Sequence, residues 1–100
     1  MREDRQRLDK WLWFARFAKS RTLAAKLVTS GFVRVNGQRA DSAAKAVAVG
    51  DVITLALART TLVVRVEGLG QRRGPAPEAR QLYADLNEGE GALVSEDDKS

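Results

Sequence analysis

The sequence predicts an α+β domain in which two N-terminal helices pack on a small antiparallel sheet that is followed by a short C-terminal helix. Two observations support this prediction. Apolar residues recur at helical spacing in the first 30 residues, and from residue 33 they alternate between turn signals, as they do in strands. Helices that precede strands, rather than alternating with them, are typical of α+β folds. A chain of 100 residues has room for one such domain.

The first helix is predicted at residues 8–18. Leu8, Leu12 and Ala15 repeat at spacings of four and three, which places them on one helix face. Asp9 falls in the first turn, where a carboxylate favours the positive end of the helix. We interpret Asp9 as a helix-start residue for this reason.

The second helix is predicted at residues 21–30, after a break near Ala18. Ser20 is the expected N-cap, because its hydroxyl can accept a hydrogen bond from the first turn. Gly31 is the expected terminator, because glycine adopts the left-handed conformation that ends many helices. The two helices are short and closely connected, so we expect them to pack on one another.

A strand that enters a tight hairpin follows the helices. Val33 and Val35 alternate with Arg34, and Asn36-Gly37 is a strong signal for a two-residue hairpin turn. The turn exits through Gln38 and Arg39. We expect Arg34, Gln38 and Arg39 to be displayed together on one edge.

A second pair of strands is predicted at 52–58 and 61–67, after a turn at Gly50-Asp51. Residues 68–77 contain three glycines and two prolines and are expected to form a loop. A last helix is predicted from Pro77 to Leu86, because proline suits a helix start. We therefore define one domain at 1–86, with a core at about 7–57 and a strand hairpin and short helix at 58–86. Residues 87–100 are acidic and poor in apolar residues, which predicts a disordered tail.

The composition excludes several kinds of chemistry. The chain has no Cys, hence no disulfide or thiolate metal site, and no His, the commonest general base and metal ligand. Asp9, Asp41 and Asp51 show no paired spacing. We predict no enzymatic activity, no catalytic residue, no metal and no cofactor. The charged N-terminus and the lack of a long apolar run lead us to expect a cytoplasmic protein without membrane contact.

The basic residues are concentrated in the first half of the chain. The net charge is +4, yet residues 1–45 hold 11 Lys and Arg against 4 Asp and Glu. Arg21 stands at a helix start, where a cation opposes the helix dipole but backbone N–H groups favour an anion. A phosphate held by both groups would explain this position. The set predicted to bind phosphate is Arg7, Lys10, Arg16, Lys19, Arg21, Lys26, Arg34 and Arg39.

Trp11, Trp13, Phe14 and Phe17 lie within seven positions, and a single helix face cannot bury them all. Each tryptophan has two interpretations, as a core residue under the strands or as a stacking surface for an unpaired base. The sequence leaves open which tryptophan, if either, stacks.

Two longer patterns resemble known families. RLDKWLW at 7–13, VRVNGQ at 33–38 and Gly50-Asp51 look like the S-four-type RNA-binding domain (the αL motif) of ribosomal proteins. RLDKWLWFARFAKSR at 7–21 together with QRRGPAPEARQLY at 71–83 is similar to the ribosome-associated heat shock protein fifteen family of bacteria. The first pattern covers about 7–57, and the second extends the resemblance to about residue 86.

The resemblance implies a curved sheet and a protein that is not an enzyme. It also implies binding to ribosomal RNA on free large ribosomal subunits that carry a nascent chain on tRNA, and help in their rescue or recycling after stress. We expect a monomer that binds structured RNA, with tRNA as another RNA partner. Carried over by position, the RNA-binding candidates are Arg7, Lys10, Arg16, Lys19, Arg21, Arg34, Asn36, Gln38 and Arg39, with Arg72 and Arg73 as a further basic pair.

The chain departs from these families at two places. Ser42-Ala43-Ala44 stands where the domain often has Lys-Pro-Ser, so a basic contact is missing unless Lys45 supplies it. Familiar members also carry a long basic C-terminal extension, whereas residues 87–100 are acidic, which implies weaker or differently selective ribosome binding. Two alternatives remain open: a general structured-RNA or tRNA module that assists an RNA-modifying enzyme, and a protein-interaction adaptor that uses the tryptophans and the acidic tail.

Overall fold

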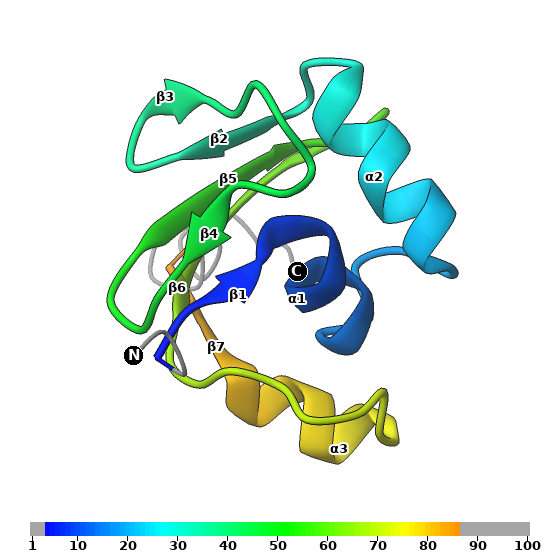
Figure 1. Ribbon diagram of the computed structural model, residues 1–100, viewed down its shortest axis with the longest axis vertical. Coiled ribbons are helices and arrows are strands. Elements are labelled where there is room, and N and C mark those ends of the chain that lie inside the picture. Colours follow the sequence, from blue (N-terminus) through cyan, green and yellow to red (C-terminus); the bar gives the residue numbers. More distant parts are fainter. Residues whose placement is uncertain (1–3, 87–100) are drawn as a thin grey trace, which may run out of the picture.

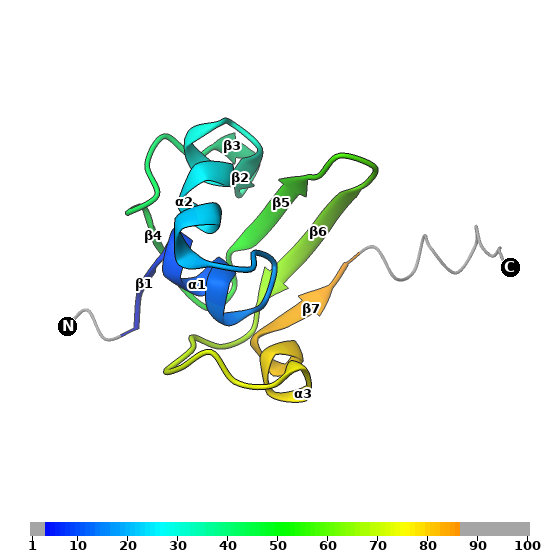
Figure 2. The same cartoon turned by 90° about the vertical axis from the view of Figure 1, so that its right-hand side faces the viewer.

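The computed structural model describes residues 4–86 and confirms the α+β class (Figure 1). Two helices lie on one face of a five-stranded antiparallel sheet, and a short helix flanks its far edge (Figure 2). The helical elements are α1 (Leu8–Phe14), α2 (Arg21–Thr29), α3 (Ala76–Ala79) and the 3-10 turn η1 (Arg80–Leu82). The strands are β1 (Gln6–Arg7), β2 (Val33–Val35), β3 (Gln38–Arg39), β4 (Ala46–Val47), β5 (Val52–Ala56), β6 (Thr61–Val66) and β7 (Tyr83–Asp85).

The five-stranded sheet has the order β3-β2-β5-β6-β7, and every neighbouring pair is antiparallel. A separate two-stranded ladder joins β1 to β4. The ladder is absent from the sequence prediction, since two-residue strands leave no alternating pattern to detect. It fixes the chain just before α1 against the segment after β3.

The first helix ends at Phe14, four residues earlier than predicted. Arg16 takes a left-handed conformation with φ 67°. The Arg16 N–H donates to the Trp13 carbonyl and the Phe17 N–H to the Leu12 carbonyl, which together form a Schellman motif. The prediction failed here because arginine carries no sequence signal for this conformation.

The second helix follows the prediction at both ends. The Ser20 hydroxyl accepts a hydrogen bond from the Leu23 N–H at 3.1 Å. Gly31 has φ 88°, and the N–H groups of Gly31 and Phe32 close a second Schellman motif on Val28 and Leu27. The two helices pack against each other as expected.

The Asn36-Gly37 hairpin is confirmed, with φ 53° and 85° at the two turn residues. The prediction of a helix from Pro77 to Leu86 is wrong beyond Leu82. The helix lasts one turn from Ala76 to Ala79, and Tyr83–Asp85 then forms β7. Pairing with the otherwise open edge of β6 outweighs local helix propensity there.

The core lies between the helices and the sheet. Its fully buried large side chains include Leu8, Trp11, Leu12, Ile53 and Leu55. None of the helices within residues 4–86 is long and apolar enough to cross a membrane. The predicted acidic tail at 87–100 lies outside the described residues.

Candidate nucleic-acid interface

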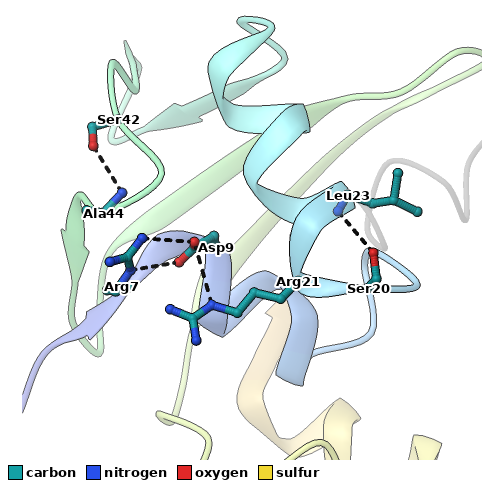
Figure 3. A network of polar contacts seen from close by, with 7 residues as sticks. All are labelled: Arg7, Asp9, Ser20, Arg21, Leu23, Ser42 and Ala44. Carbon is teal, nitrogen blue, oxygen red and sulfur yellow. Dashed lines mark hydrogen bonds and ion pairs between the residues drawn. The ribbon is translucent and has the colours of Figure 1, made fainter.

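The Asp9 carboxylate organises two arginines at the adjoining starts of α1 and α2 (Figure 3). Arg7 donates from Nε to Oδ1 and from Nη2 to Oδ2 of Asp9, both at 3.1 Å. Arg21 Nε lies 3.7 Å from Oδ2 of the same carboxylate. The Asp9 side chain is only 4% exposed, whereas those of Arg7 and Arg21 are 50% and 43% exposed. The carboxylate therefore faces inward and the guanidinium groups face solvent.

Local backbone geometry creates this arrangement. Arg7 is the extended N-cap residue of α1, Asp9 lies in the first turn of α1, and Arg21 is the first residue of α2. Packing of the two helix starts brings the three side chains together. Hydrogen bonding to Asp9 and its opposite charge raise the pKa of Arg7 above its usual value. Two arginines against one carboxylate leave a positive site whose side chains are held in place.

The segment that replaces the Lys-Pro-Ser pattern lies against the start of α1. The Leu8 N–H donates to the Lys45 carbonyl at 2.8 Å, and the Asp9 N–H donates to the Ala43 carbonyl at 3.1 Å. Ser42 accepts a hydrogen bond from the Ala44 N–H through its hydroxyl (Figure 3). The backbone of Lys45 is thereby held at the start of α1, and its side chain is exposed. Asp9, Arg7 and Arg21 are called the Asp9 cluster below.

The β2–β3 hairpin places two arginines side by side. Arg34 and Arg39 are direct cross-strand partners, so both side chains leave the same face of the ladder. Both are exposed, and neither has a carboxylate partner within residues 4–86. Like charges in this position destabilise a sheet, so the pair carries a cost in stability.

Arg39 also covers the end of α2. A Cβ atom added to Gly31 would lie 2.8 Å from Nη2 of Arg39, so the guanidinium rests directly on the glycine. The hairpin is thus tied to the helix pair through one of its predicted phosphate-binding residues. Gln38, the other residue of β3, is exposed.

Asn36 has a structural role in the turn. Its side-chain amide donates to Asp51 at 3.2 Å, and its carbonyl oxygen accepts from the Val52 N–H at 2.9 Å. These bonds use both ends of the amide and hold the hairpin turn to the start of β5. Its predicted RNA contact would have to form beside them, at the exposed surface of the turn.

Three lysines leave their charge available. Lys10, Lys19 and Lys26 make no ion pair within the described part of the chain. Lys10 Nζ lies 5.7 Å from the centroid of the Phe14 ring, and Lys19 and Lys26 are exposed at the start and the last turn of α2. An ammonium without a carboxylate partner can neutralise a phosphate at the lowest cost.

Arg16, Arg72 and Arg73 instead hold the 68–77 loop to the rest of the domain. Arg16 donates from Nε to the Gly74 carbonyl at 2.7 Å, and Arg73 donates from Nη2 to the Ala18 carbonyl at 3.3 Å. Arg72 makes a bidentate ion pair with Glu78, with contacts of 3.1 and 2.7 Å. These three candidates are brought together by the loop, apart from the Asp9 cluster, and their assignment to RNA stays a prediction.

The two tryptophans differ in their burial. Trp11 is fully buried and donates from its indole N–H to the Gly68 carbonyl at 2.9 Å, so it cannot stack on a base. Trp13 is partly buried, with its ring stacked on Phe14 at 5.4 Å and the Arg73 guanidinium 5.8 Å above it. Both rings therefore make contacts within the fold, and of the two only Trp13 keeps exposed surface that a ligand could contact.

Two features of this face lie outside the final list of RNA-binding candidates. The first is the organising role of Asp9, which we had interpreted only as a helix-start residue. The second is Lys26 at the last turn of α2, which was in the basic set but not among the final candidates. The spacing between Asp9 and Arg21 carries no local signal, because the contact depends on how α1 and α2 pack. Within residues 4–86 there is no group of His, Cys, Asp or Glu that could hold a metal.

Residues 6–53 match the S4 domain family. The chain is 42% identical over 83 residues to a heat shock protein 15 homolog of Haemophilus influenzae, an alignment that spans 83% of this chain and 63% of that relative. It thus covers less than two thirds of that relative's length. It is 38% identical over 72 residues to the small ribosomal subunit protein uS4 of Xanthobacter autotrophicus, covering 70% of this chain and 35% of that protein.

A solved structure supports the same relationship. Heat shock protein 15 of Vibrio cholerae, described as trimeric, superposes with a TM-score of 0.80 at 42% identity. The superposition covers 88% of each chain. The similarity in sequence and in fold therefore extends well beyond the match to the S4 domain.

Proposed function

The chain belongs to the heat shock protein 15 family, and on that premise we propose that it binds structured RNA through the face formed by α1, α2 and the β2–β3 hairpin. The match of residues 6–53 to the S4 domain supports the general claim that the chain binds RNA. The observation that carries the proposal is the Asp9 cluster, in which one nearly buried carboxylate holds Arg7 and Arg21 at the surface. Arginines positioned in advance lose little conformational freedom when they bind phosphate.

The proposed contacts fall into two groups. The primary contacts are the cations of the proposed face: Arg7, Lys10, Lys19, Arg21, Arg34 and Arg39, with Lys26 and Lys45 beside them. Gln38 and the exposed part of Asn36 complete the hairpin edge. Arg16, Arg72 and Arg73 come second, because they are bonded to the 68–77 loop and its surroundings rather than placed on this face.

The mechanism is phosphate neutralisation combined with recognition of RNA shape. The proposed face consists mainly of cations, which favours contacts with the RNA backbone over sequence readout. RNA binding of this kind needs no catalytic group, and none of the relatives reported above is named as an enzyme.

We test RNA binding with a matched pair of double variants. Lys10→Gln with Lys19→Gln removes two available charges from the proposed face. Arg59→Gln with Arg80→Gln makes the same change in net charge at the β5–β6 turn and at η1, away from that face. We expect the first variant to bind a structured RNA fragment more weakly in a filter-binding assay, and the second to bind almost as the wild type does. Equal losses in the two variants would reduce the proposed site to a general charge effect.

We further propose that the RNA is ribosomal RNA on free large subunits that carry a nascent chain on tRNA. In this role the protein would assist the rescue or recycling of these subunits after stress. The family's name, heat shock protein, and the relationship to a ribosomal protein support a stress-related ribosomal role. Sedimentation of a bacterial lysate through sucrose gradients at low and moderate salt tests it. We expect the protein to travel with free large subunits and to leave them as salt rises. A protein that stays at the top of the gradient yet binds purified RNA would exclude this role and favour the general structured-RNA or tRNA module.

We propose that the RNA-binding unit is a single chain. The ion pairs of the Asp9 cluster form within one chain, which supports this proposal. Light scattering of the free protein and of its RNA complex tests this proposal. A trimer at micromolar concentration, as described for the Vibrio cholerae relative, would contradict it.

A further inference from the structure

An apolar groove lies beside the basic face, between α2 and the end of β5. Its volume is about 440 Å³, and its lining includes Phe17, Leu23, Leu27, Phe32 and Leu57. Leu23 and Phe32 are each 47% exposed, which is unusual for large apolar side chains that lie next to one another. Lys19 and Lys26 also line the groove and make no ion pair within residues 4–86. The groove therefore suits a short apolar segment flanked by acidic residues.

The chain itself contains such a segment. Ala92-Leu93-Val94 is the longest apolar run in residues 87–100, and it lies between Glu88 and Glu90 on one side and Glu96, Asp97 and Asp98 on the other. This part of the chain holds five acidic residues against one lysine. Its charge is thus opposite to that of the first half of the protein.

The last described residues approach the groove. The Tyr83 ring lies 4.7 Å from the ring of Phe17, which is a lining residue. From there β7 runs antiparallel to β6, and the Leu86 N–H donates to the Val63 carbonyl, so the chain heads toward the 57–60 turn. Leu57, another lining residue, belongs to that turn. The seven residues from Leu86 to Leu93 can span roughly 25 Å when extended.

We propose that residues 87–100 dock on the protein's own groove, with Leu93 and Val94 inserted between α2 and β5 and the flanking carboxylates placed near Lys19 and Lys26. Docking buries apolar side chains on both partners and pairs opposite charges. Because Lys19 belongs to the proposed RNA-binding face, the docked segment competes with RNA. That last consequence rests on the proposed function, whereas the docking itself does not.

The docking is tested on the full chain without RNA. The protein has no Cys, so Ser95→Cys accepts a nitroxide spin label at one site. We expect paramagnetic broadening of the backbone amides of Leu23, Leu27 and Leu57. The amide of Val49, in the turn at the opposite end of β5, serves as the reference that stays sharp.

A second variant separates specific docking from charge attraction. Leu93→Ser with Val94→Ser keeps the net charge, and we expect it to abolish the broadening. The proposal is overturned if the broadening persists in this variant. It is also overturned if the spin-labelled Ser95→Cys protein shows no broadening or the same broadening at every amide. Broadening that appears only when spin-labelled protein is mixed with isotope-labelled protein assigns the groove to a second copy and also overturns it.

RNA binding provides the last measurement. The Leu93→Ser, Val94→Ser variant of the full chain should bind RNA more tightly than the wild type, because the competing segment is released. If neither protein binds RNA, the proposed function fails. The broadening experiment still tests whether residues 87–100 dock on the groove.

Discussion

The Asp9 carboxylate determines how much positive charge the helix starts offer to a ligand. It neutralises one charge and in return holds two guanidinium groups with their outer edges in solvent. Its own burial prevents it from facing an approaching phosphate. A negative residue can thus assist anion binding, through position rather than charge.

We expect Asp9→Asn to weaken RNA binding although it adds one positive charge. The amide loses the charge-assisted hydrogen bonds to Arg7, so the free energy of unfolding should also fall by about 1–2 kcal/mol. Chemical denaturation and RNA titration measure the two effects. Asp41→Asn is the matched control, because Asp41 is exposed and makes no ion pair within residues 4–86. Tighter binding by both variants would show that Asp9 only repels RNA.

The Arg72–Glu78 pair predicts a pH dependence. The hydrogen bond from Arg72 lowers the pKa of Glu78 below its usual value of 4.5. A carboxyl group with a lowered pKa stabilises the folded state above its usual pKa, and this contribution disappears as the pH falls through the lowered value. Arg72→Gln should therefore be less stable than the wild type near neutral pH and approach it in acid.

Carboxyl NMR titration measures the Glu78 pKa directly. We expect it to rise toward 4.5 in Arg72→Gln and to stay low in Arg80→Gln, because the Glu78 carboxylate accepts its hydrogen bonds from the guanidinium of Arg72 and not from that of Arg80. A Glu78 pKa that does not change in Arg72→Gln would mean that the ion pair does not persist in solution.

At the scale of elements, the two helices end in the same Schellman motif but with different residues. Gly31 ends α2 at φ 88°, and Arg16 ends α1 at φ 67°. A glycine has no Cβ and accepts this conformation without strain, whereas an arginine needs compensation. The bond from Arg16 Nε to the Gly74 carbonyl supplies it and attaches the 68–77 loop to the helix end.

Gly31→Ala tests the link between α2 and the hairpin. An alanine in this conformation costs roughly 1–2 kcal/mol, and its Cβ would displace the Arg39 guanidinium. We expect reduced thermal stability together with weaker RNA binding. Gly50→Ala is the control, because Gly50 also has a positive φ but no atom within 4 Å of an added Cβ. Gly50→Ala should therefore lose stability and keep its RNA affinity.

The predictions that succeeded rest on local chemistry. The Ser20 cap, the Gly31 terminator and the Asn36-Gly37 turn each depend on residues that are neighbours in the sequence. The β1–β4 ladder, β7 and the Asp9–Arg21 contact depend on segments that meet only in the folded chain. Sequence reasoning therefore could not distinguish Lys10 and Lys19, which make no ion pair within residues 4–86, from Arg16 and Arg72, whose guanidinium groups are bonded within the fold.

At the scale of the whole molecule, the uneven distribution of charge along the sequence becomes an uneven distribution of charge over the folded domain. The basic residues of 5–45 lie on β1, α1, α2, β2 and β3 and on the segments that flank these elements (Figure 1). β6, β7 and α3 come from residues 46–86, which hold 5 Lys and Arg against 4 Asp and Glu, and they form the other side of the domain. A positive electrostatic field over one side of a protein orients an incoming polyanion and raises its rate of association.

This asymmetry predicts a strong and specific dependence on salt. If about six phosphates are neutralised, the logarithm of the RNA association constant should fall with the logarithm of salt concentration at a slope of roughly −4 to −5. Lys10→Gln with Lys19→Gln should reduce the steepness by about two, because each lysine accounts for one phosphate contact. Arg59→Gln with Arg80→Gln should lower affinity slightly and leave the slope unchanged, since those side chains touch no phosphate. Titrations between 50 and 300 mM salt distinguish the cases, and a flat response of the wild type would exclude phosphate neutralisation as the source of affinity.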